Sequence, residues 1–201
     1  MVLLNITNIY YINLESRLDR KIHTEEQLKN VNLIGKRFPA IKNDKGSLGC
    51  ALSHIECLEY AYTNNFDHVL ICEDDITFLN PELFTSQLNI FLSLHDKWDV
   101  LFICGNNVGP YKNIDNTCIQ VTKCQTATGY IINGHNYIKK ILDCFKESLN
   151  TCYPIDLAWW TLQQQDTWFL LIPLTVVQKA DYSDIEKKQV NYVDQMLTLN
   201  Y

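Results

Sequence analysis

Short apolar runs that stop at polar residues alternate along the chain with longer segments of helical periodicity. The runs have the pattern of buried strands, and apolar positions three and four residues apart predict amphipathic helices. The runs predicted as strands are 8–14, 37–41, 68–75, 99–105, 126–134 and 168–177, the last broken at Pro173. Helices are predicted after residue 16, from Leu48, from Pro81, after residue 134 and after Pro154. Strands alternating with helices predict an α/β fold.

Two details refine this pattern. Ser16 and Asp19 have the spacing of a capping box, and Ile22, Leu28 and Val31 recur on one side of the helix behind them. The run 37–41 contains a proline, which cannot donate to a central ladder, so we predict an edge strand there.

Length and charge narrow the class of protein. The 201 residues predict a single domain, 1–201, whose polar end, 187–201, is expected to be mobile. The net charge is −6 and basic residues form no long stripe, which disfavours nucleic-acid binding. No apolar run is long enough to span a membrane, and the first residues lack the pattern of a signal peptide. We therefore expect a soluble, cytoplasmic protein, with a lumenal or membrane-peripheral location as the alternative.

Eight cysteines are present, but they form no C-x-x-C pair and no dense framework. The sequence therefore favours buried, reduced thiols, and a Cys118–Cys124 bridge across a hairpin is the alternative. The absence of closely spaced ligand pairs disfavours a cysteine-ligated zinc site.

Three acids, Glu73, Asp74 and Asp75, follow an apolar strand directly. Strand alternation predicts that Glu73 and Asp75 project to the same side, where their charges repel unless a cation compensates. Mg²⁺ or Mn²⁺ is the expected cation, because hard divalent ions prefer oxygen ligands and keep positions open for phosphate. The alternative is an acidic loop that caps the next helix.

A second polar group follows the first strand. Asn13 suits a base or ribose edge, and Arg17 or Arg20 suits a phosphate, so this segment is a candidate nucleotide site. The alternative is that both arginines are solvated surface residues.

The order and character of several motifs resemble glycosyltransferase family 25, which includes bacterial lipooligosaccharide galactosyltransferases and collagen hydroxylysine galactosyltransferases. The resemblance is carried from about residue 8 to residue 186 by YYINLESRLDR, GSLGCALSHIECLEYA, VLICEDDITF, ATGYIING, YPIDLAWW and QKADYSDIE. It implies a GT-A-like fold with a mixed, mostly parallel central sheet flanked by helices. It also implies an inverting, metal-dependent transfer of galactose or glucose from UDP-galactose or UDP-glucose.

The resemblance further implies a set of site residues. Glu73 and Asp75 fall on the family's metal site, and Asp156 and His54 are the expected catalytic residues. Residues expected to bind the donor are Asn13, Leu14, Arg17, Arg20, Ser53 and Asp74. Gly129 is expected to bind it too, because a glycine in a strand lets a ligand approach the backbone closely. The acceptor is expected to be a hydroxyl on a glycan, a lipid-linked glycan or a protein.

The residues themselves leave alternatives open. Inverting transfer needs a base beside the acceptor hydroxyl, and Asp156, after a proline and before two tryptophans, is the candidate; a third metal ligand and a helix cap are its alternatives. On a helical wheel His54 borders the apolar face and Ser53 points away from it, so His54 either lines the site or is structural. Trp159 and Trp160 either stack on a sugar or belong to the core.

Two other function classes compete with the transferase. One is a catalytically weak GT-A scaffold that binds a nucleotide sugar or a partner protein. The other is Mg²⁺-dependent phosphoryl transfer, which is disfavoured because no P-loop accompanies the acids.

Overall fold

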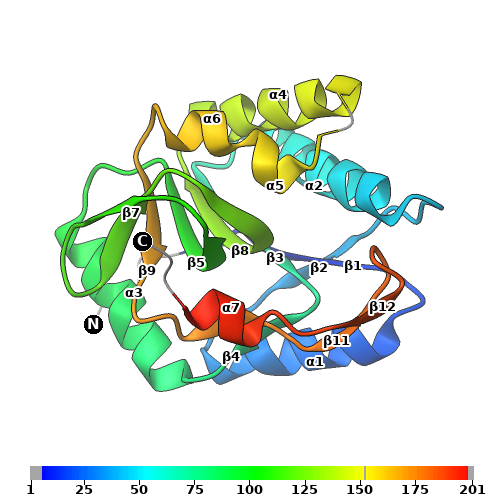
Figure 1. Cartoon of the computed structure of the whole chain (residues 1–201), viewed down its shortest axis with the longest axis horizontal. Coiled ribbons are helices and arrows are strands. Elements are labelled where there is room, and N and C mark those ends of the chain that lie inside the picture. The colour runs from blue at the N-terminus through cyan, green and yellow to red at the C-terminus, as the bar shows by residue number, and fades with distance from the viewer. Residues whose placement is uncertain (1–5, 152, 199–201) are drawn as a thin grey trace.

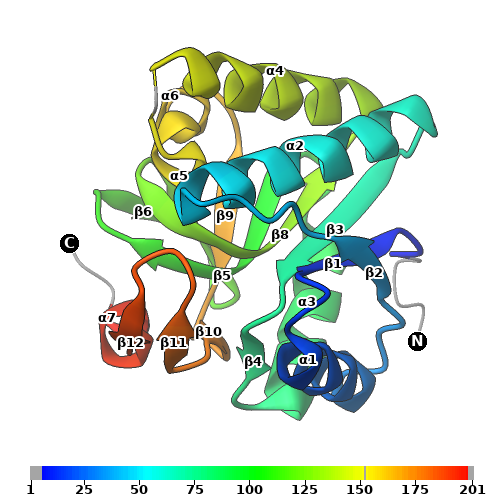
Figure 2. The same cartoon turned by 90° about the vertical axis from the view of Figure 1, so that its right-hand side faces the viewer.

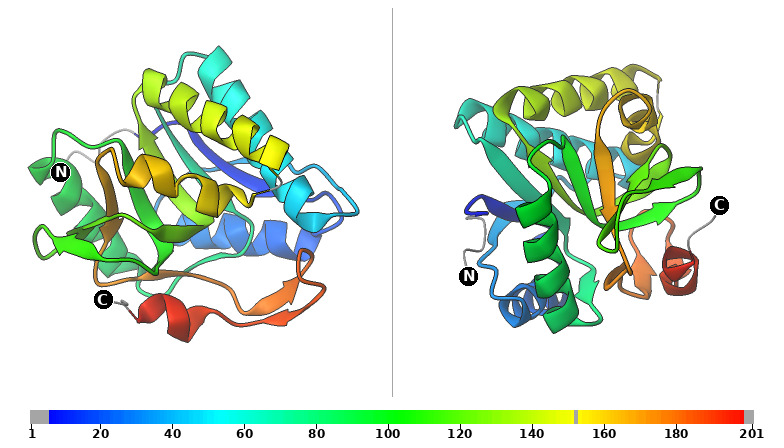
Figure 3. Two further views of the ribbon diagram at one scale, coloured as in Figure 1. Left: turned by 45° about the horizontal axis from the view of Figure 1, so that its top comes forward. Right: turned by 90° about the vertical axis from the view of Figure 1, so that its left-hand side faces the viewer.

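The computed structural model describes residues 6–151 and 153–198, which form three layers (Figure 1). A central sheet lies between a layer containing α2 and α4 and a layer containing α1 and α3, as the rotated views also show (Figure 3). The elements in chain order are β1 (Ile9–Asn13), α1 (Leu18–Asn30), β2 (Lys36–Pro39), α2 (Gly46–Thr63), β3 (His68–Glu73), β4 (Ile76–Phe78), α3 (Pro81–Leu94), β5 (Val100–Asn107), β6 (Tyr111–Asn113), β7 (Cys118–Val121), β8 (Cys124–Asn133), α4 (His135–Thr151), α5 (Ile155–Ala158), α6 (Trp160–Gln163), β9 (Trp168–Leu171), β10 (Val176–Gln178), β11 (Asp181–Ser183), β12 (Lys188–Val190) and α7 (Val193–Leu197).

The main sheet has the strand order β2-β1-β3-β8-β5-β9-β7-β6. β1 pairs in parallel with β2 and β3, and β5 with β9, while β8 lies antiparallel between β3 and β5. At the far side β7 is antiparallel to both β9 and β6, so that only β7 and β8 oppose the common direction. The prediction of an α/β fold with a mixed, mostly parallel sheet flanked by helices is confirmed.

Each face of the sheet supports its own apolar core. On one face Ile55 and Leu58 of α2 and Phe145 of α4 pack against strand residues. On the other, Phe84 of α3 and Met196 of α7 join a second cluster. These two cores fix the strands, and therefore the position of the residues at their ends.

The predicted edge strand is confirmed, because β2 lies at one end of the sheet order and Pro39 is its last residue. The predicted helix after residue 134 is also confirmed as α4, and the segment after Pro154 forms two short helices. Cys118 and Cys124 are free thiols, so the alternative bridge between them is absent.

The prediction for α1 is wrong in two respects. Its N-cap is Arg17 and makes no side-chain cap hydrogen bond, so the Ser16 capping box does not form. Ile22 is 50% exposed, and the buried face of the helix is instead Arg20, Thr24 and Leu28. This face is partly polar because it meets the acidic turn after β3, where Thr24 Oγ1 donates to the carbonyl oxygen of Asp74 at 2.8 Å.

The C-terminal segment forms β10, which pairs with β4, and the hairpin β11–β12. Figure 2 shows this hairpin beside α7, in orange and red. A Cβ at Gly46, the first residue of α2, would lie 2.7 Å from the Cα of Ile185, so the hairpin loop approaches the start of α2 closely. Part of the tail that was predicted to be mobile thus forms β12 and α7, and residues 199–201 lie outside the described chain. The single-domain interpretation and the mobility of the tail stay predictions.

Within residues 6–151 and 153–198, the helices lack the combination of length and apolar character that crossing a bilayer requires.

Candidate active site

Two adjoining cavities lie at the edge of the sheet where β1, β3 and β5 end. The first, of about 400 Å³, is lined by the ends of β1 and β3, the start of α2 and the β11–β12 hairpin. The second, of about 430 Å³, is lined by β5, β8 and α5. Both are lined by Cys50, Glu73, Gln178, Ser183 and Ile185. Glu73 thus lies where the two cavities meet, at the strand ends that bind ligands in open α/β sheets.

The prediction from strand alternation assumed that the strand continues through the three acids, but it does not. β3 ends at Glu73, and Asp74 and Asp75 form a turn before β4. All three acids nevertheless line the first cavity. The physical basis of the prediction was therefore wrong, although the turn brings Glu73 and Asp75 to the same space.

Asp75 is buried and only partly compensated. It is 5% exposed; its Oδ2 accepts from Gln178 Nε2 at 2.9 Å and lies 3.5 Å from Arg20 Nη1. Its Oδ1 is buried and has no hydrogen-bond partner among the described residues. Burial, followed by the charge of Glu73, raises the pKa of Asp75 to about 7. A buried carboxylate oxygen without a donor is a site where a cation fits, because it offers lone pairs that nothing else satisfies.

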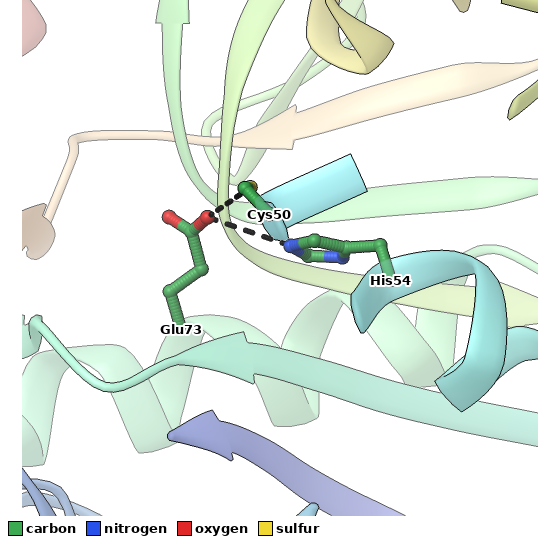
Figure 4. A group of neighbouring side chains, drawn as sticks. All are labelled: Cys50, His54 and Glu73. Atoms are coloured by element: carbon green, nitrogen blue, oxygen red, sulfur yellow. Dashed lines mark hydrogen bonds and ion pairs between the residues drawn. The ribbon is translucent and has the colours of Figure 1, made fainter. Parts of the chain in front are cut away.

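Glu73 has several partners, two of which are drawn in Figure 4. Its Oε1 lies 3.4 Å from His54 Nε2 and 3.5 Å from Cys50 Sγ, and Oε2 accepts from Thr128 Oγ1 at 3.1 Å. Burial acts to raise the pKa of Glu73, but His54 and these hydrogen bonds outweigh it, and the pKa is lowered. The ligand atoms of Cys50, His54 and Glu73 lie within 4.8 Å of one another. A thiol and an imidazole favour a softer ion than the predicted Mn²⁺ or Mg²⁺.

His54 is fully buried, and its Nδ1 lies 2.8 Å from the hydroxyl of Tyr130. Ser53 is also buried, contrary to the helical-wheel expectation, because its Oγ donates to the carbonyl oxygen of Gly49 and accepts from the amide of Ile41. Both residues line the first cavity. The start of α2 therefore presents two hydrogen-bonded polar residues to that cavity.

The predicted nucleotide-binding arginines are engaged with carboxylates. Arg17 forms ion pairs with Asp19, Asp181 and Asp184, and does not line either cavity. Arg20 lies 2.9 Å from Asp74 Oδ1 and 3.3 Å from Asp181 Oδ2, and it lines the first cavity. In this structure the two guanidiniums hold the hairpin against α1 and neutralise the acidic turn.

Asn13 is likewise buried and does not line the first cavity. It is 1% exposed, donates to Asp74 Oδ2 at 2.7 Å and accepts from Arg37 Nε at 2.9 Å. Burial raises the pKa of Asp74, against the opposing effects of Arg20 and Asn13. Leu14, the next residue, does line the first cavity.

Two lysines supply positive charge without an ion pair. Lys42 and Lys187 line the first cavity, from the loop before α2 and from the tip of the β11–β12 hairpin. Neither ammonium group forms an ion pair with a residue in the described ranges. They are therefore the cations of this cavity that are available to an anionic ligand.

Asp156 lines the second cavity together with Glu73. Its Oδ2 accepts from the amide of Thr126 at 3.2 Å, and burial raises its pKa. Thr126 has a φ of +79°, a rare conformation for a β-branched residue. It lies in the part of β8 where the pairing with β5 is irregular. The strained residue thus positions the carboxylate that the sequence singled out.

Asn106 is a lining residue of the second cavity that the sequence did not indicate. It is 4% exposed, and its Oδ1 is buried with no hydrogen-bond partner among the residues described. Asn106 lies near the carboxyl end of β5, and Glu73 lies at the carboxyl end of β3. A search for polar residues at the carboxyl ends of apolar strands would therefore have found Asn106. Gln178 and Lys187 carried no such local signal.

Three other candidates are explained by packing. A Cβ at Gly129 would lie 2.9 Å from Ile103 Cγ1, so its missing side chain makes room for the core, and the residue lines neither cavity. Trp159 is fully buried. Trp160 is half-buried, with its ring 5.7 Å from Lys123 Nζ. Both indoles donate to the carbonyl oxygen of Cys124.

Sequence comparison identifies the family. The profile of glycosyltransferase family 25 (LPS biosynthesis protein) matches residues 44–159. The chain belongs to this family. The matched region contains Glu73, Asp75 and Asp156, while β1, α1 and the C-terminal hairpin lie outside it.

The individual proteins that are similar to this chain either match a shorter part of it than the family does or have a low sequence identity. A Haemophilus influenzae (strain ATCC 51907 / DSM 11121 / KW20 / Rd) protein named "Putative glycosyltransferase" is 44% identical over 52 residues, which are 26% of this chain and only 18% of the relative. A glycosyltransferase involved in the glycosylation of the major capsid of PBCV-1 is 9% identical, with 83% of this chain and 92% of that chain covered and a TM-score of 0.43. A Drosophila galactosyltransferase 7 in complex with manganese, UDP-Gal and xylobiose is 10% identical, with 93% and 72% covered and a TM-score of 0.43. Neither structure assigns a role to a residue of this chain.

Proposed function

We propose that this glycosyltransferase moves galactose or glucose from a UDP-sugar to a hydroxyl acceptor, with inversion at the anomeric carbon and with Mn²⁺ or Mg²⁺ bound. The observation that carries the proposal is the pair of adjoining cavities with Glu73 between them. One is lined by Asp75, whose Oδ1 is buried without a partner among the described residues, and the other is lined by Asp156. A transferase needs two such spaces, one for the donor and one for the acceptor.

The first cavity suits the donor. Asp75 and Glu73 would hold the metal ion, whose chemistry is to neutralise the charge that develops on the leaving diphosphate. The all-oxygen donor set of these two acids fits a hard cation, and the unsatisfied Oδ1 of Asp75 supports this assignment. Lys42 and Lys187 would contact the diphosphate, because Arg17 and Arg20 are paired with carboxylates.

The second cavity suits the acceptor. Asp156 would accept the proton of the attacking hydroxyl, and its raised pKa improves its strength as a base over an exposed aspartate. The Thr126 amide fixes one oxygen of this carboxylate. Asn106 offers a carbonyl oxygen on the same cavity wall, where a sugar hydroxyl could donate to it.

The decisive experiment measures UDP release from UDP-galactose and from UDP-glucose, with Mn²⁺ and with a chelator, in the presence and absence of soluble sugar acceptors. We expect release that depends on the metal and is faster with one donor. The surface variant Asp143→Asn, on the outer face of α4, serves as the matched carboxylate control and should release UDP at the wild-type rate. Donor binding with no release to water or any acceptor would instead support a weak scaffold that only binds the nucleotide sugar.

A further inference from the structure

Three side chains with metal-binding atoms converge outside both cavities. His95 is the C-cap of α3, Asp115 lies in the turn between β6 and β7, and Cys118 is the first residue of β7. His95 Nε2 lies 2.8 Å from Asp115 Oδ2 and 3.6 Å from Cys118 Sγ. All three ligand atoms lie within 4.8 Å of one another.

Two potential metal ligands approach one nitrogen of His95. Asp115 Oδ2 and Cys118 Sγ both lie beside Nε2, whereas in a Cys-His-Asp catalytic relay they would lie on opposite nitrogens. Without an ion, Nε2 and the thiol can both hydrogen-bond to the Asp115 carboxylate. With both groups deprotonated, the same three atoms lie close enough for one ion to contact each of them.

The separations suit a tetrahedral ion. Zinc bonds of about 2.0 Å to nitrogen and 2.3 Å to sulfur at the tetrahedral angle place those two atoms about 3.5 Å apart. The observed distance between His95 Nε2 and Cys118 Sγ is 3.6 Å. A zinc-bound nitrogen and oxygen would lie about 3.3 Å apart, whereas His95 Nε2 and Asp115 Oδ2 are 2.8 Å apart. Asp115 therefore needs to move by about half an ångström, which its partly exposed side chain allows.

The surroundings orient the ligands and leave an entry path. Asp115 Oδ1 accepts from the amide and the hydroxyl of Thr117 and from the amide of Cys118, which leaves Oδ2 directed to the cluster. The His95 ring packs against Phe91 and Phe169, with centroids 4.7 and 5.5 Å away. The side chain of His95 is 16% exposed and that of Asp115 29% exposed, so that water can reach a fourth position. The C-terminus of α3 also favours a cation.

We propose that His95, Asp115 and Cys118 bind one zinc-class divalent ion, with water as the fourth ligand, and that this ion ties the β6–β7 turn to the end of α3. On binding, the thiol proton of Cys118 leaves to bulk water and the thiolate coordinates the ion. The sequence disfavoured a cysteine-ligated zinc site because no ligand pair is closely spaced. Here a single cysteine is joined by an aspartate three residues before it in the same turn, and the packing of α3 against the sheet brings in His95.

The test uses the full chain, stripped of metal by a chelator and kept reduced, and titrated with Co²⁺ and then with Zn²⁺. We expect a thiolate-to-cobalt charge-transfer band at one Co²⁺ per chain, loss of that band on addition of Zn²⁺, and a higher melting temperature with Zn²⁺. Cys118→Ser should abolish the band, and His95→Gln should weaken Zn²⁺ binding by at least about tenfold.

The controls separate this cluster from the proposed active site. Cys50→Ser removes the thiol of the other group, and Asp75→Asn removes the proposed Mn²⁺ ligand; both should retain the cobalt band. Asp115→Asn keeps an oxygen for the turn and provides a second ligand variant if Cys118→Ser fails to fold. A band that survives in both Cys118→Ser and His95→Gln, that disappears in Cys50→Ser, or that never forms would overturn the proposal. Because no nucleotide sugar is used, the outcome is independent of the transferase activity.

Discussion

The guanidinium of Arg20 lies 2.9 Å from the carboxylate of Asp74, and both side chains are nearly buried. The same guanidinium is within 3.5 Å of Asp75 and 3.3 Å of Asp181. One cation on α1 therefore compensates acids of the strand-end turn and of the C-terminal hairpin. Without it, Asp74 and Asp75 would lose this cation, while Asp181 would keep its ion pair with Arg17.

Arg20→Leu should lower the free energy of unfolding by about 3–5 kcal/mol, because it leaves buried carboxylates uncompensated. The loss should be smaller at pH 4, where protonation relieves the repulsion. Urea unfolding at both pH values measures this. Lys21→Leu, on the exposed side of the same helix, is the control and should change stability by less than about 0.5 kcal/mol. Equal losses in the two variants would contradict the role given to Arg20.

Asp75→Asn should stabilise the metal-free protein at pH 8 by about 1–2 kcal/mol, since active-site charges are commonly held at a cost in stability. The pKa of Asp75 is raised to about 7 in the folded chain, above about 3.9 for an unfolded aspartate. The folded state therefore keeps a proton that the unfolded state loses, and the contribution of Asp75 to stability falls as pH rises from about 4 to about 7. The gain in the variant should vanish near pH 4. A variant less stable than the wild type at pH 8 would show that the carboxylate is well compensated.

The same variant should lose Mn²⁺-dependent binding of UDP while keeping its fold. Isothermal titration calorimetry of UDP with Mn²⁺, alongside far-ultraviolet circular dichroism, measures the two properties separately. Unchanged affinity for UDP with Mn²⁺ would remove Asp75 from the metal site.

Asp156→Asn should spare donor binding and slow transfer by about 10²–10⁴-fold, the usual contribution of a general base. Comparison of the UDP dissociation constant with kcat distinguishes this role from that of a third metal ligand. If the variant loses Mn²⁺-dependent UDP binding instead, Asp156 acts on the metal rather than on the acceptor.

Lys187→Ala should weaken UDP binding by about threefold at low salt, and less at high salt, because the lysine is exposed and its charge is screened. Lys188→Ala is a matched control: this neighbouring lysine pairs with Glu186 and does not line the first cavity. Identical losses in the two variants would point to the overall charge of the hairpin rather than to a contact of Lys187.

Trp159→Ala should lower the free energy of unfolding by about 3–5 kcal/mol, because the ring is fully buried against Phe102, Tyr130 and Trp168. Trp160→Ala removes a half-buried ring and should cost less. Chemical denaturation of both variants measures the difference. A larger loss of stability for Trp160 would reverse the assignment of Trp159 to the core.

Strands and helices could be predicted from the sequence where the pattern of apolar residues follows from burial. The apolar run before Glu73 and the periodicity of α4 depend on burial alone. Both elements formed, although β3 ends at Glu73, two residues before the end of the predicted strand. The prediction failed at α1, because a helix that faces acids buries Arg20 and Thr24 and leaves Ile22 exposed. Apolar periodicity cannot recognise a helix whose inner face is polar.

Some residues of the candidate site could likewise be predicted from a local pattern, and others could not. The three acids after β3 could be found because they are consecutive and end an apolar strand. Gln178 could not, because its place beside Asp75 depends on the pairing of β10 with β4, which lie about a hundred residues apart in the chain. The ion pairs of Arg17 with Asp181 and Asp184 depend on the same folding-back of the C-terminal segment.

The folding-back of that segment affects how the protein can be shortened. The family profile ends at residue 159, yet Gln178, Ser183, Ile185 and Lys187 complete the walls of the first cavity. A fragment cut at the family boundary would keep every acid of the proposed mechanism. It would nevertheless open the first cavity to water and leave Arg17 and Arg20 without Asp181. Expression boundaries chosen from family similarity alone would therefore remove the part of the chain that closes the first cavity.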